Sequence, residues 1–232
     1  MPTIADNLKR VNERIAAASS RCGSPDLEDI RLVAVSKTKP VSLLEDALVA
    51  GATDLGENRV QEALGKFDVL GDRATWHLIG HLQTNKARHA VRMFDMIHSV
   101  DRLHLGEEIS KRCLVLGKTM PVLVQVKTSD EDTKAGIAPE QALELIEQLS
   151  ALPGISVQGL MTIPALSTEP DDARPAFALL RDLRDRVVSA AIDDVEMRYL
   201  SMGMTHDFEV AIEEGANMIR VGTAIFGARP VF

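Results

Sequence analysis

Short apolar runs alternate with amphipathic stretches along the whole chain. Eight of the runs have the length and composition of buried strands. Helical periodicity marks the intervening stretches, among them residues 41–51, 59–70, 101–117 and 139–152. This alternation predicts parallel strands joined by crossover helices. The eight predicted strands are residues 31–37, 53–57, 76–80, 96–100, 121–127, 155–161, 197–201 and 217–222.

Eight strand–helix units favour an α/β fold, a single (β/α)8 TIM barrel domain over residues 1–232. The length and the hydrophobic content of 45% suit one such domain with a large core. An open doubly wound sheet is the structural alternative, but the GxGxxG turn that would favour it does not follow the first strand. Residues 1–18 predict an extra amphipathic helix rather than an apolar signal segment.

Turn residues support these boundaries. Gly51, Gly117 and Gly215 stand where helices are expected to end in the left-handed conformation. Pro40 suits the first turn of a helix. Residues 167–175 are expected to form a long loop that leads into a helix.

Composition narrows the possible functions. A net charge of −8 without a basic run argues against nucleic-acid and anionic-membrane partners, and six Phe, one Trp and one Tyr are few for stacking on bases. Cys22 and Cys113 form no CxxC motif, so we expect free thiols in a reducing compartment. No window has the apolar length of a membrane span. We therefore expect a soluble cytoplasmic protein.

Polar or small residues stand at nearly every predicted strand end. In a (β/α)8 barrel the C-terminal ends of the strands carry the chemistry. A ring of such residues therefore predicts a site at that end of the barrel. The ring consists of Ser36, Lys37, Gly56, Glu57, Asn58, Gly80, His81, Ser99, Asp101, Lys127, Thr162, Ser201, Met202, Gly203, Arg220, Gly222 and Thr223.

The last two strand ends have the composition of a phosphate site. Ser201 and Gly203 follow the seventh predicted strand, and Gly222 and Thr223 follow the eighth, where a short helix is expected to begin. Loops in these two places form the recurrent phosphate site of this barrel. Glycines let backbone N–H groups approach an anion, and a helix N-terminus adds positive potential. Ordinary turn chemistry is the alternative explanation.

Two cations occupy unexpected positions. Lys37 directly follows an apolar run, where it either extends to water or acts as a reactive amine in a pocket. Arg220 lies inside the eighth predicted strand, where its guanidinium either pairs with a carboxylate or points toward a ligand. A lysine and a phosphate site at one barrel mouth fit a lysine aldolase or pyridoxal 5′-phosphate. Arg220 suits the ring nitrogen of the second ligand, and an aldolase has no special use for it.

The histidines do not predict a metal site. His77 and His81 are four residues apart, which on a helix would form a metal-binding pair. On a strand the same spacing separates them by roughly 13 Å, so one ion cannot bridge them. We expect His77 to be structural and His81, beyond the strand end, to be within reach of a ligand.

Seven ordered motifs between Leu32 and Arg229 are LVAVSKTKP, GENRVQEA, WHLIGHLQTNK, EDTKAGI, GLMTIP, LSMGMTHDFEVAIEEGA and IRVGTAIFGAR. They resemble the signatures of the pyridoxal phosphate homeostasis protein family, whose fold is similar to the barrel domain of alanine racemase. The resemblance implies that Lys37 forms a Schiff base with pyridoxal phosphate, that Arg220 faces the pyridine nitrogen, and that other residues hold the phosphate or line the cofactor. Those other residues are Ser201, Gly222 and Thr223 for the phosphate, and Asn58, His81 and Met202 for the lining.

Four positions depart from the family pattern. Arg59 replaces a usual aromatic residue, Lys127 an asparagine, Thr205 a serine and Leu78 a phenylalanine. None of these changes removes a Schiff-base or phosphate residue. Arg59 and Lys127 alter the charge expected near the pocket mouth.

The resemblance implies a protein that buffers and delivers pyridoxal phosphate without a catalytic residue of its own, in transient contact with apo-enzymes. The sequence shows no evident apolar surface stripe, so we expect a monomer. A pyridoxal phosphate-dependent amino-acid racemase is the alternative. Racemisation needs acid–base groups on both faces of the cofactor, and the chain has neither a second domain nor a tyrosine other than Tyr199. Lys134 matches a family lysine, and we hypothesise that it passes the cofactor outward; a solvated loop lysine is the other interpretation.

Overall fold

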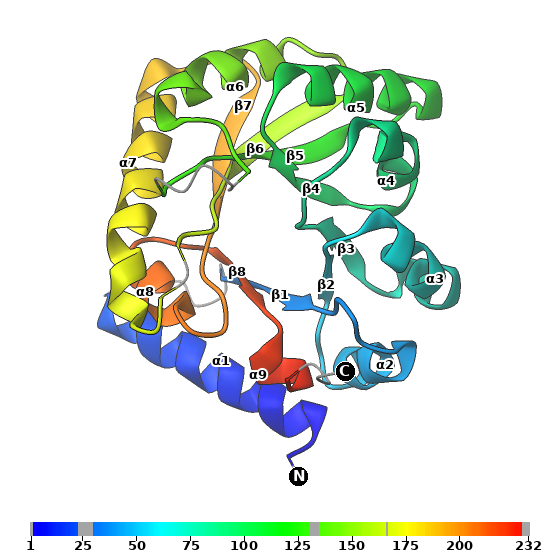
Figure 1. Ribbon diagram of the computed structural model, residues 1–232, viewed down its shortest axis with the longest axis vertical. Helices are drawn as coiled ribbons and strands as arrows, with labels where there is room; N and C mark the ends of the chain where they lie inside the picture. The colour runs from blue at the N-terminus through cyan, green and yellow to red at the C-terminus, as the bar shows by residue number, and fades with distance from the viewer. Residues whose placement is uncertain (1, 23–29, 130–134, 166, 229–232) are drawn as a thin grey trace.

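Parallel strands close into one barrel in chain order, as Figure 1 shows. The structure is a computed structural model that describes residues 2–22, 30–129, 135–165 and 167–228. It confirms the predicted (β/α)8 barrel and each predicted strand. The strands are β1 (Arg31–Val35), β2 (Asp54–Glu57), β3 (Thr75–Leu78), β4 (Met96–Val100), β5 (Met120–Gln125), β6 (Ile155–Met161), β7 (Val195–Ser201) and β8 (Met218–Val221).

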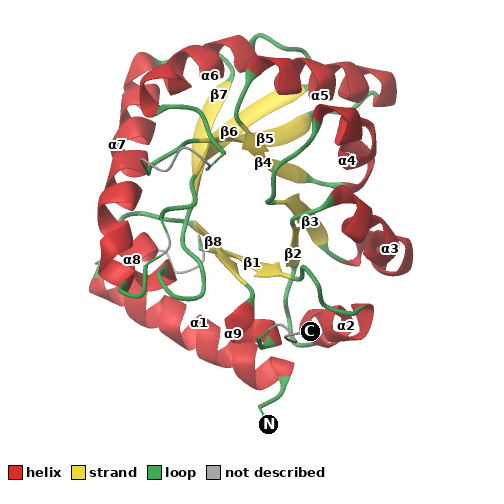
Figure 2. Cartoon of the chain, in the orientation of Figure 1, coloured by secondary structure: helices red, strands yellow, loops and turns green. Residues whose placement is uncertain are grey.

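Helices surround the barrel and connect consecutive strands (Figure 2). They are α1 (Ile4–Arg21), α2 (Val41–Val49), α3 (Val60–Leu70), α4 (Ala87–Met93), α5 (Leu103–Leu116), α6 (Ala142–Ser150), α7 (Arg174–Ala190), α8 (Phe208–Glu213) and α9 (Thr223–Phe226). Short 3-10 turns occur at Gly71–Arg73, Thr84–Lys86, Pro139–Gln141 and Pro170–Ala173. In the part of the chain that the structure describes, no helix combines the length and the apolar character needed to cross a bilayer.

The extra N-terminal helix is present. Thr3 and Asp6 form a capping box that satisfies free N–H groups at the start of α1. Leu8, Val11 and Ile15 recur at helical spacing and are buried, while the rest of the helix is largely polar. This apolar stripe packs α1 against α8 and α9 at the seam where the barrel closes (Figure 1).

Helix boundaries follow the turn residues with one exception. Gly51, Gly117 and Gly215 all have positive φ, which confirms their predicted left-handed role. The predicted loop before α7 is also present, and it ends in the 3-10 turn that precedes Arg174. Pro40 does not lie in the first turn of α2 as predicted. It has extended backbone angles and is the residue just before the helix, because its carbonyl accepts the bond from the N–H of Leu43.

The barrel interior contains an apolar layer and a polar layer. The main core lies between the strands and the surrounding helices. Inside the barrel, a small separate cluster is formed by Val33, Met96, Leu123, Met161 and Met218. Buried polar side chains occupy the rest of the interior, and they include His77, His98, Ser201 and Arg220. Buried polar groups need hydrogen-bond partners, so this second layer is the part of the fold that bears on function.

Gly159 in β6 tests the barrel packing. Its φ is +151°, and a Cβ built there would lie 1.9 Å from the carbonyl oxygen of Tyr199. We expect Gly159→Ala to lower the free energy of unfolding by at least ~2 kcal/mol, because backbone of β7 would have to move.

Gly65 is the matched control for that substitution. It lies on the exposed face of α3 with nothing within 4 Å of a built Cβ. Gly65→Ala should raise the free energy of unfolding by about 0.5–1 kcal/mol, because alanine restricts the unfolded chain and favours helix. Urea denaturation measures both variants. Equal stability of the two would contradict the close approach of β6 and β7.

Candidate functional site

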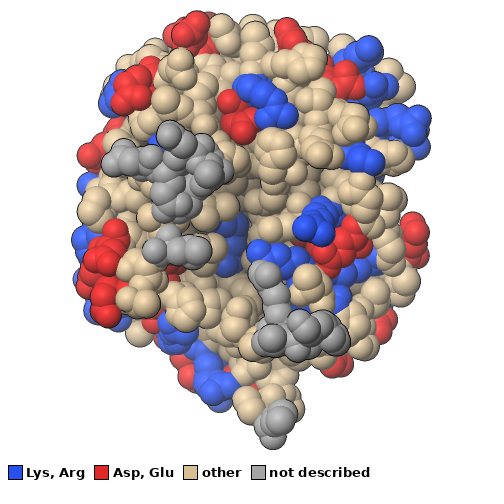
Figure 3. Space-filling view, viewed as in Figure 1, with Lys and Arg blue, Asp and Glu red and all other residues tan. Residues whose placement is uncertain are grey.

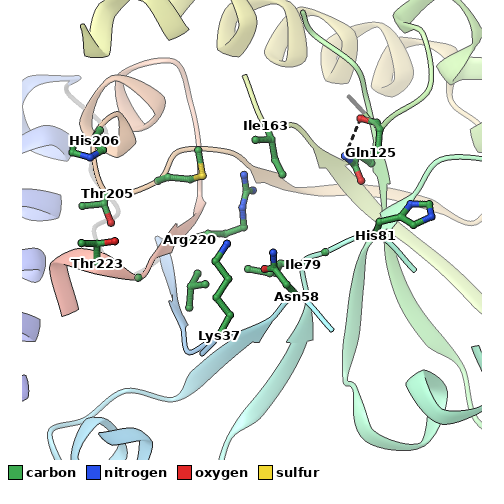
Figure 4. A pocket seen from close by; sticks show the side chains of 15 residues that line it. Lys37, Asn58, Ile79, His81, Gln125, Ile163, Thr205, His206, Arg220 and Thr223 are labelled. Carbon is green, nitrogen blue, oxygen red and sulfur yellow. Dashed lines mark hydrogen bonds between the residues drawn. The ribbon is translucent and has the colours of Figure 1, made fainter. Parts of the chain in front are cut away.

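A pocket of about 530 Å³ lies at the C-terminal ends of the strands (Figure 4). This volume is within the range of small-molecule sites. Six of the eight predicted site residues line the pocket together: Lys37, Asn58, His81, Arg220, Gly222 and Thr223. Figure 3 shows that Lys and Arg side chains gather around the hollow in the middle of this face.

Lys37 follows β1 and is half-buried. Its side chain extends into the pocket toward Arg220 and Asn58 (Figure 4). The interpretation of Lys37 as a pocket residue is therefore supported over simple extension to water.

The backbone on both sides of Lys37 is held by one buried cluster. Lys66 of α3 donates to the Ser36 carbonyl at 2.7 Å, to Glu57 Oε1 at 2.6 Å and to Glu62 Oε1 at 2.8 Å. Ser36 Oγ donates to the same oxygen of Glu57 at 2.5 Å, and the Thr38 N–H donates to Glu62. These bonds fix the positions of the residues immediately before and after Lys37.

The same cluster holds strain and charge. Thr38 has φ +64°, a left-handed conformation that is uncommon for a non-glycine residue. Burial raises the pKa of Glu57, although Lys66 and Ser36 oppose the rise, and Glu57 Oε2 is buried without a hydrogen-bond partner among the described residues. Glu57 therefore points away from the pocket and supports the Lys37 turn. It does not line the pocket, although its place at a strand end put it in the predicted ring.

Lys39 is the other lysine of this turn, and it does not line the pocket. Its Nζ donates to the carbonyls of Phe226 and Gly227 at 2.9 Å and of Ala228 at 3.0 Å. These carbonyl groups lie at and just after the C-terminal end of α9, where a cation is favourable. The two lysines thus have separate roles, Lys37 in the pocket and Lys39 at the end of α9.

Arg220 is buried and reaches the pocket from β8. Its Nη1 donates to Ser201 Oγ at 2.6 Å and its Nη2 to the Thr162 carbonyl at 2.7 Å. Burial lowers the pKa of Arg220 to about 10, with Asp207 opposing, so the group stays cationic near pH 7. Both acceptors are neutral oxygens rather than carboxylates, and this favours the ligand-facing interpretation of Arg220 over a simple ion pair.

Ser201 and Met202 lie deeper than the sequence suggests. Ser201 is the last residue of β7, as the limits of the predicted strand require, rather than part of the loop in which the phosphate site was expected, and the side chains of Ser201 and Met202 are fully buried. Neither lines the pocket formed by the described residues. Strand alternation explains the difference, because it turns Ser201 into the barrel interior toward Arg220 and His98.

Hydroxyl groups occupy one side of the pocket. Thr205 and Thr223 lie there near His206, as Figure 4 shows, and Gly222 lines the same side. Asp207 Oδ1 accepts the Met204 N–H at 2.6 Å and so shapes the turn that carries Thr205. Sequence reasoning missed Thr205 and His206 as lining residues. The signal was available, since both belong to the loop that follows the seventh strand.

The opposite side of the pocket carries Asn58, His81 and Gln125 (Figure 4). Gln125 donates to the Ala135 carbonyl at 3.0 Å, which ties the end of β5 to the next segment. Ile79 and Ile163 add apolar surface. These three, Gln125, Ile79 and Ile163, were not predicted, because Ile79 and Gln125 are buried at strand ends and Ile163 is an exposed apolar residue, and neither situation has a distinctive sequence signal. His77 is fully buried and hydrogen-bonded inside the barrel, and it does not line the pocket of the described residues.

Other sequence expectations are placed as follows. Arg59 is exposed just before α3, Lys127 is half-buried after β5, and neither lines the pocket described above. Lys134 lies outside the described residues. Among those described, no group of three or more His, Cys, Asp or Glu side chains is placed to hold a metal ion.

Comparison with known proteins defines the class. Residues 6–230 match the family described as alanine racemase, N-terminal domain. The chain also resembles alanine racemase from Clostridium difficile 630 in fold, with a TM-score of 0.73 at 17% identity, and covers 58% of that chain.

More similar relatives define the family within that class. The chain is 44% identical to the pyridoxal phosphate homeostasis protein of Aquifex aeolicus, over 97% of both chains, and 40% identical to that of Escherichia coli K12, over 99% of this chain and 98% of the relative. PipY of Synechococcus elongatus, solved with pyridoxal phosphate bound, has a TM-score of 0.81 at 38% identity, covering 92% of this chain and all of PipY. The chain belongs to the pyridoxal phosphate homeostasis protein family.

The Lys66 cluster yields a stability prediction. Removing one partner of a buried ion pair leaves an uncompensated charge, so Lys66→Met should lower the free energy of unfolding by about 3–5 kcal/mol. Arg73→Met is the control, because its pair with Glu45 is half-exposed and 3.5 Å long, and such pairs contribute about 1 kcal/mol or less. Chemical denaturation compares the two. If Lys66→Met lost no more free energy of unfolding than Arg73→Met, the stabilising role of the buried cluster around Lys37 would be contradicted.

Proposed function

We propose that this protein binds pyridoxal 5′-phosphate and serves in its homeostasis, as a carrier that buffers and delivers the cofactor without turnover of its own. The observation that carries the proposal is the meeting of Lys37, Arg220 and the two threonine hydroxyls in one pocket. A lysine amine, a buried guanidinium and a hydroxyl-lined side correspond to the aldehyde, ring nitrogen and phosphate of this cofactor.

The donor set of the pocket fits the cofactor. Lys37 would hold the aldehyde carbon covalently, and Arg220 would face the ring nitrogen. Thr205 and Thr223 would donate to the phosphate, with the backbone of Gly222 close by. Asn58 and His81 would line the ring from the other side of the pocket. When bound, the cofactor supplies an electron-withdrawing ring. The intact cofactor would then be transferred to an apo-enzyme.

Three features support a carrier rather than a racemase. Arg220 remains cationic near pH 7 and offers only N–H donors, so it would leave the ring nitrogen unprotonated. Racemisation requires an acid–base group on each face, and Tyr199 is the chain's one tyrosine. Its ring lies 6.0 Å from the Arg31 guanidinium, at the start of β1 and away from the pocket. Similarity to racemases and to D-threonine aldolase, at 17% identity, concerns the fold alone.

The proposed setting is the cytoplasm, where the described cysteines, Cys22 and Cys113, would remain free thiols as they are here. The proposed partners are apo-enzymes that accept the cofactor through transient contact, and the proposed state is a monomer. Size-exclusion chromatography with light scattering addresses the second point. Transfer of bound cofactor to a purified apo-enzyme addresses the first.

Borohydride reduction tests the proposal directly. After incubation with pyridoxal phosphate, reduction should fix the cofactor to Lys37, because only that lysine of the β1 turn faces the pocket. Lys37→Ala should lose the label and the visible absorbance, whereas Lys39→Ala should keep both. Peptide mapping of the reduced protein locates the label. A colourless wild-type protein that takes up no pyridoxal phosphate would favour a sugar-phosphate aldolase instead.

The phosphate side predicts a ligand-specific loss. Thr205→Val and Thr223→Val should each remove a hydrogen bond to a charged phosphate, roughly 1.5–3 kcal/mol. Binding of pyridoxal phosphate should therefore weaken by about ten- to a hundredfold. Pyridoxal, which lacks the phosphate, is the control and should bind both variants as it binds wild type. Ser201→Ala, which alters a residue outside the pocket lining, should not show this ligand-specific pattern.

Absence of turnover is the third prediction. A panel of amino acids, followed by chiral analysis and α-deuterium exchange, should show no reaction at ordinary enzyme rates, about 1 per second or faster. The reason is Arg220, which would leave the ring nitrogen unprotonated and make the ring a poorer electron sink for chemistry at the α-carbon. Rapid racemisation of any amino acid would replace the carrier function with the racemase alternative.

A further inference from the structure

A file of buried polar side chains runs through the barrel interior from β2 to the pocket. His77 Nε2 is 2.7 Å from Asp54 Oδ1, and His77 Nδ1 is 2.9 Å from His98 Nε2. His98 Nδ1 is 3.0 Å from Ser201 Oγ, which accepts from Arg220 Nη1 at 2.6 Å. All five side chains are buried, and they come from five different strands. We name Asp54, His77, His98 and Ser201 the interior relay.

The Asp54 end of the relay sets the direction of the hydrogen bonds. Burial raises the pKa of Asp54, but hydrogen bonds from His77 and Thr53 oppose the rise, and the net result is a pKa below the ordinary value. Asp54 is therefore an ionised, acceptor-only group. It follows that the proton of His77 lies on Nε2.

The contacts at Asp54 assign the hydrogen-bond role of His77 Nδ1. The Arg31 guanidinium already lies 2.9 Å from Asp54 Oδ1, so a charged His77 would place a second cation at the same buried oxygen. His77 Nδ1 is therefore an acceptor, and His98 donates to it from Nε2. Complete burial, with the Arg220 cation nearby, lowers the pKa of His98 well below its ordinary value. His98 Nδ1 is in turn an acceptor, and it accepts a hydrogen bond from the hydroxyl group of Ser201.

The direction of these hydrogen bonds determines which part of the Ser201 hydroxyl group faces Arg220. Ser201 has one hydroxyl proton. When the hydroxyl group donates this proton in a hydrogen bond to His98, the oxygen lone pairs face Arg220 Nη1. Together with the Thr162 carbonyl on Nη2, this bond fixes the plane of the guanidinium. Without an acceptor at His98, the hydroxyl could turn its proton toward the cation and oppose the bond.

We propose that Asp54, His77 and His98 are positioning residues that act through Ser201 to orient the Arg220 guanidinium toward the ring nitrogen of the bound ligand. The proposal rests on the proposed function only for the identity of that ligand. The direction of the hydrogen bonds within the interior relay is a property of the protein alone. A merely structural set of buried residues would contribute to stability but would leave the electronic state of the ligand ring unchanged.

The first experiment needs no ligand. Nitrogen-15 NMR of histidine-labelled protein reports which ring nitrogen carries the proton. We expect neutral Nε2–H forms for both His77 and His98, and Asp54→Asn should alter the spectrum of both. An Nδ1–H form at either residue in wild type would overturn the proposal.

The second experiment uses protein loaded with pyridoxal phosphate labelled at the ring nitrogen. His98→Leu and Asp54→Asn should weaken binding by about tenfold, one hydrogen bond to a charged group, and move the ring nitrogen-15 shift. His98→Asn, which keeps an acceptor near the position of Nδ1, should restore more of the wild-type shift than His98→Gln, which does not. Asp54→Asn keeps the test available if His98→Leu fails to fold.

Thr53→Val is the matched control. It removes a 2.7 Å hydrogen bond to Asp54 Oδ2 but leaves Oδ1 and the relay in place. Its ring nitrogen shift should equal that of wild type. An unchanged shift in folded His98→Leu and Asp54→Asn, with label still fixed to Lys37, would refute the relay and leave the carrier function standing. Failure of wild type to take up the cofactor would refute the carrier function, while the histidine spectra would still judge the relay.

Discussion

A guanidinium group withdrawn from water inside the barrel is the constraint on which the site depends. An unpaired charge in such a place is strongly destabilising, so the surrounding strands must supply oxygen acceptors. Arg220 on β8 meets this requirement through Thr162 after β6 and Ser201 on β7. The consequence is that three neighbouring strands are fixed around one cation, and its remaining N–H groups are directed to the pocket.

A second buried cation performs the corresponding task on the other side of the mouth. Lys66 gathers a carbonyl and two carboxylates, and in doing so it holds the turn that presents Lys37. The two clusters are built differently. One surrounds a cation with neutral oxygens and leaves it available to a ligand, whereas the other neutralises a cation completely and uses it as a support. The pocket amine is thus held between a rigid turn and a rigid guanidinium.

The fold was predictable because its signal is repeated. Each strand–helix unit shows the same change in hydrophobic periodicity, and an error at one element boundary does not alter the number of units. Lys37 and Arg220 were detectable because a cation in an apolar run is chemically out of place. Lys66 was not, because a lysine on an amphipathic helix has the same sequence context whether it faces water or the barrel. Ser201 was expected beside the phosphate because the sequence does not show which way a side chain at a strand end turns, and Thr205 was overlooked although it belongs to the loop that follows the seventh strand.

The closing seam of the barrel has a kinetic consequence. β1 pairs directly with β8, so the first strand meets its second neighbour only when the last strand has been made. Arg220, Gly222 and Thr223 all lie on or just after that last strand. During synthesis, the chain therefore carries Lys37 for most of its length without the residues that complete the pocket. Because contacts so distant in sequence form slowly, capacity for the ligand should appear as the final event of folding, in step with closure of the barrel.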